Sequence, residues 1–183
     1  MTIKLKFLTK DDVNYSNVIK LFFEAFPKTQ SLPFWLVKLR MRNGKAGFHA
    51  LYEQDNWIGF IYAKEYKDIV FIKFFAISEA QRSHGYGSKV LNALKQTYTE
   101  QRIVLNIEAL DESTENYQQR VKRKAFYEKN GFVSTGFMVT EPAERQEMLI
   151  RGGNISKEEI DEMYKHFLGK TLYTLLKPEV TKI

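Results

Sequence analysis

Hydrophobic and polar residues follow two different spacings along the chain, and these spacings predict its secondary structure. Apolar and polar residues alternate over Ile3–Leu8, which is typical of a strand. Helical spacing follows, in a helix that Asp11 or Asp12 can cap and that runs to about Phe26. A proline suited to the first helical turn then opens a second helix, over Pro33–Met41.

Three runs rich in β-branched and aromatic residues come next and indicate strands. They cover Ala46–Glu53, Trp57–Glu65 and Ile69–Ile77, and their short connections imply an antiparallel meander. After the third strand, Ser88–Gln101 has the apolar spacing of an amphipathic helix. This helix leads to a strand over Ile103–Ile107, and such a crossover predicts that the new strand runs parallel to the third.

The rest of the chain predicts a helix, two strands, a further helix and a last strand. A capping box of Ser156 and Glu159 starts the further helix, and Gly169 ends it. There is no internal repeat and no linker, so the sequence predicts one mixed α/β domain over residues 1–183. The predicted ranges are Asn116–Asn130, Phe132–Val139, Glu147–Arg151, Ser156–Leu168 and Thr171–Leu176.

Composition narrows the classes of function. Hydrophobic residues make up 44% of the 183 residues, which indicates a globular protein. The absence of cysteine excludes disulfides, thiolate ligands and a cysteine nucleophile, and the three histidines are not spaced as metal ligands, so we expect no metal. No apolar run is long enough to span a bilayer, and the amino terminus lacks a signal peptide's apolar stretch, so we expect a cytoplasmic protein without membrane contact. The net charge of +6 favours an anionic partner but is low for nucleic acid, which we do not expect as a partner.

The most informative stretch is Gln81–Ser88, which separates the strand at Ile69–Ile77 from the helix after it. Backbone N–H groups at the start of a helix lack partners within the helix and favour a phosphate. Gly85 and Gly87 would let a ligand come close to the backbone. A P-loop needs Lys and then Ser or Thr after its last glycine, and the dinucleotide fingerprint needs a glycine where Val90 stands, so neither fits. The alternative is an ordinary tight turn.

Two motifs resemble one family. Arg82, Gly85 and Gly87 resemble the coenzyme A loop of the GNAT superfamily of N-acetyltransferases, whose pattern is Arg/Gln-x-x-Gly-x-Gly/Ala. Ala125–Phe132 resembles the family's next helix and its Gly-Phe exit. The resemblance implies a central mixed sheet, in which an antiparallel meander precedes a βαβ unit, parallel strands splay apart to bind coenzyme A, and helices cover both faces. The helix near residues 156–168 is extra relative to a minimal member.

The resemblance also implies an acetyl-CoA-dependent N-acetyltransferase in which a primary amine attacks the acetyl group directly. The strand end at Ala76 and Ile77 would receive the pantetheine arm, with the N–H of Ile77 as the donor to the thioester carbonyl. Tyr127 matches the family's general acid. The pyrophosphate of the co-substrate acetyl-CoA would lie on the loop residues Arg82, Ser83, His84, Gly85, Tyr86, Gly87 and Ser88.

One position departs from the family pattern. Many members have an Asn seven residues before the tyrosine, where this chain has Arg120. Asn116, one turn earlier, is the residue that we expect to replace it at the coenzyme. A basic run on this helix is open to two interpretations, a solvated face or a contact with the adenosine phosphate: Arg120, Lys122, Arg123, Lys124 and Lys129.

The base and the acceptor are less closely specified. Glu108, at the end of the parallel strand, is the candidate base, and a water-mediated route is the alternative. Without a catalytic role, Glu108 would be a strand-end carboxylate in solvent or in an ion pair, and Tyr127 would be a core aromatic. A competing function is a coenzyme A-binding module without catalysis.

The acceptor would be a small-molecule amine or a protein or peptide amine. Asp111, Glu112 and Glu115 lie just after the parallel strand and favour a cationic one. A homodimer is an open alternative to a monomer.

Overall fold

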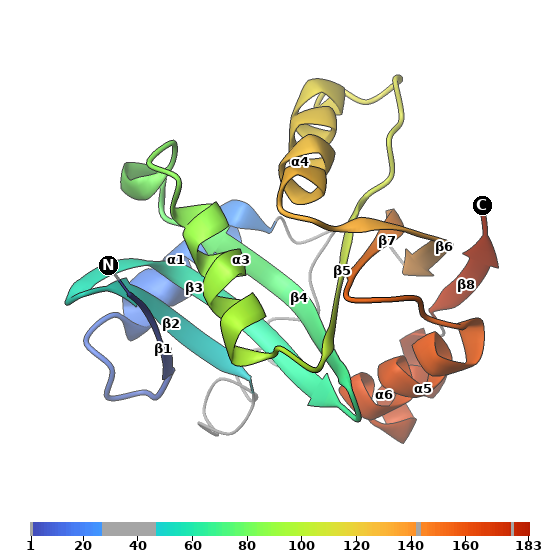
Figure 1. Cartoon of the computed structure of the whole chain (residues 1–183), viewed down its shortest axis with the longest axis horizontal. Helices are drawn as coiled ribbons and strands as arrows, with labels where there is room; N and C mark the ends of the chain where they lie inside the picture. Colours follow the sequence, from blue (N-terminus) through green and yellow to red (C-terminus); the bar gives the residue numbers. More distant parts are fainter. Residues whose placement is uncertain (1, 27–46, 142–143, 177) are drawn as a thin grey trace. The chain divides into compact units, whose positions relative to one another are not determined.

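The computed structural model describes residues 2–26, 47–141, 144–176 and 178–183. Over these residues it shows a mixed α/β fold with an eight-stranded mixed sheet and five α-helices (Figure 1). The chain divides into two compact units, and each is described by itself. The first is Met1–Lys64 with Ile72–Thr99, and the second is Glu65–Phe71 with Glu100–Ile183. The single domain stays a prediction, and the predicted helix Pro33–Met41 lies outside the described residues.

The first unit is built on four neighbouring strands. Strand β1 pairs antiparallel with β2, and β2 pairs antiparallel with β3, which is the first pair of the predicted meander. Most of β4 completes this part of the sheet. In the β2–β3 ladder, Phe48 lies opposite Tyr62, which places their aromatic rings in a stack with centroids 4.1 Å apart. The strands are β1 (Ile3–Phe7), β2 (Phe48–Glu53), β3 (Asn56–Tyr66) and β4 (Ile69–Ile77).

Two helices cover these strands, and Figure 1 shows α3 in front of them and α1 behind. Helix α1 (Tyr15–Ala25) buries Phe22, whose ring meets that of Phe74 edge-on at 5.0 Å. Helix α3 (Tyr86–Thr97) buries its apolar stripe of Val90, Leu91 and Leu94. It begins two residues earlier and ends four residues earlier than the sequence predicted.

The expected cap of α1 is wrong. Asn14 precedes the helix, and neither Asp11 nor Asp12 caps it. Asp12 instead accepts hydrogen bonds from the backbone N–H of Asn14 and from the hydroxyl of Tyr52, and it pairs with Lys6. An aspartate side chain can accept hydrogen bonds either in a turn or at the start of a helix. Here Lys6 of β1 and Tyr52 of β2 bind Asp12, so it lies in the turn before the helix.

The second unit continues with the first residues of β4 and then β5, β7, β6 and β8 in that order. The ladders β5–β7, β6–β7 and β6–β8 are all antiparallel. An irregularity between Ser134 and Met138 interrupts β6, and Gly136 has a φ of 77° within it. These strands are β5 (Arg102–Glu108), β6 (Val133–Glu141), β7 (Glu144–Arg151) and β8 (Glu179–Lys182).

Helix α4 (Tyr117–Lys129) ends as the Gly-Phe exit predicts. Gly131 takes the left-handed conformation with a φ of 83°, and its N–H bonds the carbonyl of Glu128. The N–H of Phe132 bonds the carbonyl of Tyr127, and the two rings lie 5.6 Å apart. These two bonds and the hydrophobic contact form a Schellman motif.

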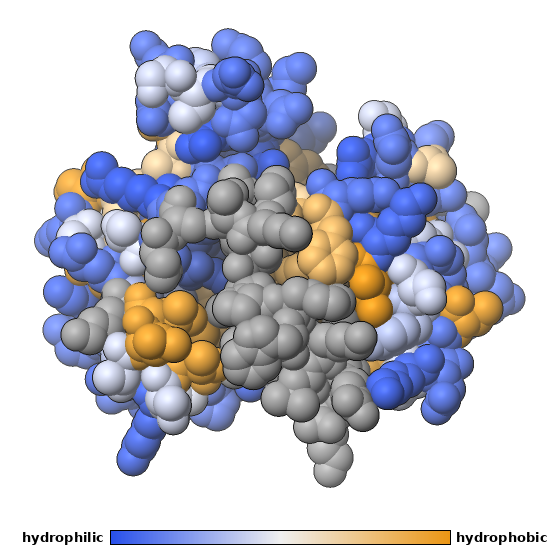
Figure 2. All heavy atoms as spheres, turned by 180° about the vertical axis from the view of Figure 1, so that it is seen from behind, coloured by the Kyte–Doolittle hydropathy of each residue, from blue (hydrophilic) through white to orange (hydrophobic). Residues whose placement is uncertain are grey.

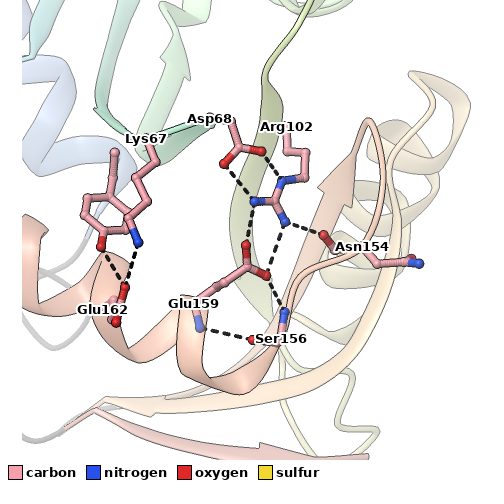
Figure 3. Close-up of polar contacts among 8 residues, drawn as sticks. Lys67, Asp68, Arg102, Asn154, Ser156, Glu159 and Glu162 are labelled. Carbon is pink, nitrogen blue, oxygen red and sulfur yellow. Dashed lines mark hydrogen bonds and ion pairs between the residues drawn. The ribbon is translucent and has the colours of Figure 1, made fainter.

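Helix α5 (Lys157–Leu168) begins with the predicted capping box. Glu159 N–H bonds the hydroxyl of Ser156, while the carboxylate of Glu159 accepts from the Ser156 N–H. Figure 3 shows that Arg102 of β5 reaches the same carboxylate, together with Asp68 and the carbonyl of Asn154. The start of α5 is thus tied to β5 and to the turn before β4.

The predicted last strand Thr171–Leu176 is wrong, because this segment is helix α6 (Lys170–Leu176). The hydroxyl of Thr174 bonds the carbonyl of Lys170, one turn back. Tyr173 packs against α5, with its hydroxyl on Asp161. The threonines and the tyrosine suggest a strand by propensity, but contacts with α5 override propensity here. The last strand is β8, three residues further on.

None of the helices in the described ranges is long and apolar enough to cross a membrane. On the face in Figure 2, the described residues are mostly hydrophilic, with hydrophobic ones in separate patches.

Replacing Ser156 by Ala should lower the free energy of unfolding by about 1 kcal/mol, because it removes one half of the capping box. In a chain of this size that corresponds to a fall in melting temperature of about 2–4 °C. Thermal and denaturant unfolding measure both. The control is Ser16→Ala, since Ser16 lies exposed inside α1, where alanine is the better helix former. Equal stability of Ser156→Ala and the unmodified chain would contradict the capping role.

Candidate active site

The loop after β4 leads into helix α3, whose first turn has no side-chain cap. A single 3-10 turn (Glu79–Gln81) follows the strand, and Ser83 and Gly85 then take positive φ values of 64° and 75°. Gly85 is the residue before α3, and the space around its missing side chain is open within 4 Å. The first N–H groups of a helix have no partners within it, so this loop and α3 offer donors and a positive dipole end to an anion.

The loop residues differ in exposure. The first four are exposed and the last three are half-buried, and Gly87 lies within the first turn of α3. Helical backbone does not require glycine, so the conformation of this residue does not explain it, and the close approach of a ligand to Gly87 stays a prediction. The exposed ones are Arg82, Ser83, His84 and Gly85, and the half-buried ones are Tyr86, Gly87 and Ser88.

The end of β4 is fixed from two sides. The N–H of Ser78 donates to the carbonyl of Ile58 on β3, at 2.9 Å. Neighbouring N–H groups of an extended chain point to opposite edges, so the N–H of Ile77 points away from β3. Arg82 folds back from the loop and donates through Nε to the carbonyl of Ile77, at 3.2 Å. Arg82 therefore links the loop to the strand end, next to the nearly buried Ala76.

Gly59 is a supporting residue that sequence reasoning missed. A Cβ at this position would lie 2.2 Å from the carbonyl oxygen of Ala76, so any side chain would push β3 away from the end of β4. A glycine inside a strand pattern signals such a close approach, and that signal was available in the sequence.

A second missed feature holds the start of α3. The carboxylate of Glu53, at the end of β2, accepts from the hydroxyl of Tyr86 at 2.7 Å and pairs with Lys89 at 2.6 Å. Lys89 and Tyr86 lower the pKa of Glu53, which keeps it charged. The hydroxyl of Tyr86 is thus engaged within the protein, and its part in coenzyme binding stays a prediction.

In the second unit, Tyr127 is the single buried residue of α4. Its ring lies against Phe126 and Phe132. Burial raises the pKa of Tyr127 to about 12, and the charge of Arg123 works against this rise. The phenol is therefore protonated at neutral pH, as a proton donor must be.

Glu108 ends β5 and forms an ion pair with Arg123. Its side chain is 8% exposed, against 42% for Arg123. Of the alternatives open in the sequence, the structure therefore shows the ion pair. Whether Glu108 also takes a proton from an amine stays a prediction.

Two further cations of α4 bind carboxylates of β7. Arg120 lies 3.6 Å from Glu144, and Lys124 lies 2.8 Å from Glu147. The basic run is therefore only partly a solvated face. Its remaining members, Lys122 and Lys129, are exposed.

Asn116 stands directly before α4 but makes no side-chain cap. The side-chain oxygen Oδ1 of Asn116 accepts from Nε of Arg120 at 2.9 Å, and Arg120 also donates to the backbone carbonyl of Ala109. Asn116 thus fixes Arg120, and its contact with a coenzyme stays a prediction.

The first unit brings together the strand end and the whole loop, from Ala76 to Ser88. The second brings together Glu108, Arg123 and Tyr127, with Asn116 at the start of the same helix. Within the described part of the chain, no three acidic or histidine side chains are grouped so that they could hold a metal ion.

Known proteins share this architecture. A GNAT-family protein from Bacteroides thetaiotaomicron, described as an acetyltransferase, has a TM-score of 0.67 and 22% identity, covering 96% of this chain and 97% of its own. The aminoglycoside 6′-N-acetyltransferase from Enterococcus faecium has a TM-score of 0.57 and 18% identity, covering 82% and 96%.

Naa50 from Arabidopsis thaliana, in complex with the bisubstrate analogue CoA-Ac-MVNAL, has a TM-score of 0.54 and 19% identity, covering 84% and 100%. A search of curated proteins finds no match. The family model "Acetyltransferase (GNAT) domain" matches residues 44–134, which include the loop, β5 and Tyr127. The chain therefore carries an acetyltransferase domain of the GNAT family.

Proposed function

We propose that the protein transfers the acetyl group of acetyl-CoA to a primary amine, by direct attack of the amine on the thioester. The observation that carries this proposal is the loop after β4, where two positive φ values expose the helix start to an anion. A related fold has been solved as an aminoglycoside 6′-N-acetyltransferase with coenzyme A, and another with a bisubstrate analogue of coenzyme A.

The residues would divide the binding as follows. The loop Arg82–Ser88 would hold the pyrophosphate, mostly through the backbone N–H groups after Arg82, whose own N–H donates to the carbonyl of Glu79. Asn116 would add a contact to the coenzyme. The strand end at Ala76 and Ile77 would hold the pantetheine arm, and the N–H of Ile77 would stabilise the negative charge on the carbonyl oxygen.

The reaction forms a C–N bond and breaks a C–S bond. The amine must be neutral to attack, although a free alkyl amine has a pKa of about 10. Glu108, directly or through a water, would take the proton that the amine loses. Tyr127 would give its phenolic proton to the departing sulfur. Holding amine and thioester together supplies further acceleration, because it replaces a bimolecular encounter.

A coenzyme A-binding module without catalysis is the second candidate. The protonated, buried Tyr127 opposes it, because a module that only binds has no need of a proton donor. An assay for free thiol from acetyl-CoA distinguishes the two, since a binding module releases none with any amine.

The acceptor is a small-molecule amine or a protein or peptide amine, and the same thiol assay can screen both classes. The cytoplasmic location and the homodimer stay predictions.

Replacing Gly85 by Val should abolish binding of acetyl-CoA and of coenzyme A alike, because a β-branched residue is strained at a φ of 75° and blocks the helix start. Calorimetric titration measures this. Gly136→Val is a matched control, since Gly136 has a φ of 77° and the same open surroundings in β6. The loop assignment fails if folded Gly85→Val binds as tightly as Gly136→Val.

Replacing Tyr127 by Phe should leave acetyl-CoA binding nearly unchanged and lower turnover by about 10²–10⁴-fold, as for a lost general acid. The loss should shrink with an acetyl thioester of a better leaving group. Steady-state rates with both thioesters test this, with Tyr117→Phe on the same helix as the control. Turnover of Tyr127→Phe at the unmodified rate would make Tyr127 a core aromatic only.

Replacing Glu108 by Gln should lower the rate at neutral pH, and raising the pH should partly restore it as more free amine becomes available. An unfolded variant would show no such recovery, so a pH–rate profile separates a lost base from a lost fold. Glu128→Gln, an exposed carboxylate of α4, is the control. An unchanged rate and pH profile would make Glu108 a bystander, and a weaker affinity for the acceptor alone would make it an anchor.

A further inference from the structure

Arg123 is placed to act on Tyr127. The two residues are one turn apart on α4, at the i and i+4 spacing that puts side chains on the same face. Arg123 is also the charge that acts on the buried phenol of Tyr127. The motif Ala125–Phe132, which marks Tyr127 in the sequence, says nothing of a cation at position 123.

The proposed reaction creates a need for such a cation. As the C–S bond breaks, sulfur leaves with the bonding electrons and takes the phenolic proton, which leaves a negative charge on the Tyr127 oxygen. A free thiol has a pKa of about 8.5, well below the value of about 12 to which burial raises Tyr127. The proton therefore moves from the phenol, which is the weaker acid, to the thiolate, and this direction is unfavourable. The buried phenolate that remains is also unfavourable unless a positive charge faces it.

We propose that Arg123 is a positioning residue that stabilises the charge left on Tyr127 during proton donation, and that Glu108 holds Arg123 in place for this. This inference rests on the proposed acetyl transfer. Solvent afterwards carries the proton that Glu108 took from the amine back to Tyr127, so the cycle consumes no net proton and needs no further reactant.

The contacts of Arg123 suit this role. A long, 42% exposed arginine side chain has many conformations, and its partner Glu108 is 8% exposed and fixed at the end of β5. An ion pair with a fixed carboxylate restricts the guanidinium without discharging it, because arginine stays protonated. The neighbouring cations Arg120 and Lys124 are paired with carboxylates of β7 instead.

The test is a set of variants at position 123. Arg123→Gln should lower kcat about tenfold, with an unchanged KM for acetyl-CoA, because it removes the positive charge that stabilises the phenolate; tenfold corresponds to about 1.4 kcal/mol. The loss should shrink with an acetyl thioester of a better leaving group. Arg123→Lys keeps the charge and should recover most of kcat. Lys95→Gln removes an exposed cation from the last turn of α3, outside the basic run of α4, and should change nothing.

The decisive measurement is the double variant. If Arg123 acts through Tyr127, Arg123→Gln should lower kcat little in a Tyr127→Phe background, where there is no phenol to stabilise. A full additional loss in that background overturns the inference, as does a folded Arg123→Lys as slow as Arg123→Gln with the same leaving-group dependence.

The failure of the inference and that of the proposed function look different. If the unmodified protein releases no thiol with any amine, or Tyr127→Phe turns over normally, the proposed function or its acid is wrong. If Tyr127→Phe is slow and Arg123→Gln is normal, only the role of Arg123 is wrong. The loss of rate in Glu108→Gln should depend on the leaving group as it does in Arg123→Gln. If it does not, Glu108 is not the residue that holds Arg123 in place.

Discussion

The attachment of α4 to β5 and β7 is the constraint on which the proposed chemistry depends. This helix buries one side chain, Tyr127, so apolar packing alone cannot fix its rotation about its own axis. Three cations on α4 meet three carboxylates on the two strands, and these pairs set the orientation that packing leaves open. Removing one partner of such a pair leaves a charge partly withdrawn from water, which costs more than the pair itself gains.

Helix α4 is held by two kinds of contact, and it carries the residue that we propose as the proton donor. Salt screens ion pairs near the surface, whereas it does not weaken the apolar packing of the Tyr127 ring. The side chains of Arg120 and Glu144 are 12% and 11% exposed, so theirs is the least screened pair of the attachment, whereas Arg123 is 42% exposed and Lys124 is 26% exposed. Helix α4 thus holds the proposed proton donor Tyr127 by its buried ring, and ion pairs with β5 and β7 fix the orientation of the helix.

Local sequence signals predicted the parts of the fold that depend on neighbouring residues. The capping box at Ser156, the left-handed Gly131 and the strand before the glycine loop are all set within a few residues, and the structure confirms them. Asp12 and the segment Thr171–Leu176 were wrong because distant partners decide them. Residues of β1 and β2 draw Asp12 into a turn, and α5 supports a helix where propensity favoured a strand.

The candidate site divides in the same way. The loop from Arg82 to Ser88 and Tyr127 could be found from motifs, since their spacing is local. The partner of Glu108 could not, because it depends on how a helix fifteen residues further along the chain lies on the strand. Likewise, the hydrogen bond from Tyr86 to Glu53 joins residues 33 positions apart, so no local sequence pattern predicts it.

Arg102 of β5 links helix α5 near the end of the chain to the sheet. Its partners Asp68, Asn154 and Glu159 lie 34, 52 and 57 residues away, and its side chain is 15% exposed (Figure 3). During synthesis, β5 leaves the ribosome well before two of these three partners exist. Until α5 forms, the guanidinium keeps at most one of its carboxylates, so this part of the protein completes late and as a unit. Helix α5, which is extra relative to a minimal family member, thus supplies a carboxylate that Arg102 of β5 needs. A chain shortened before α5 would leave Arg102 without Glu159.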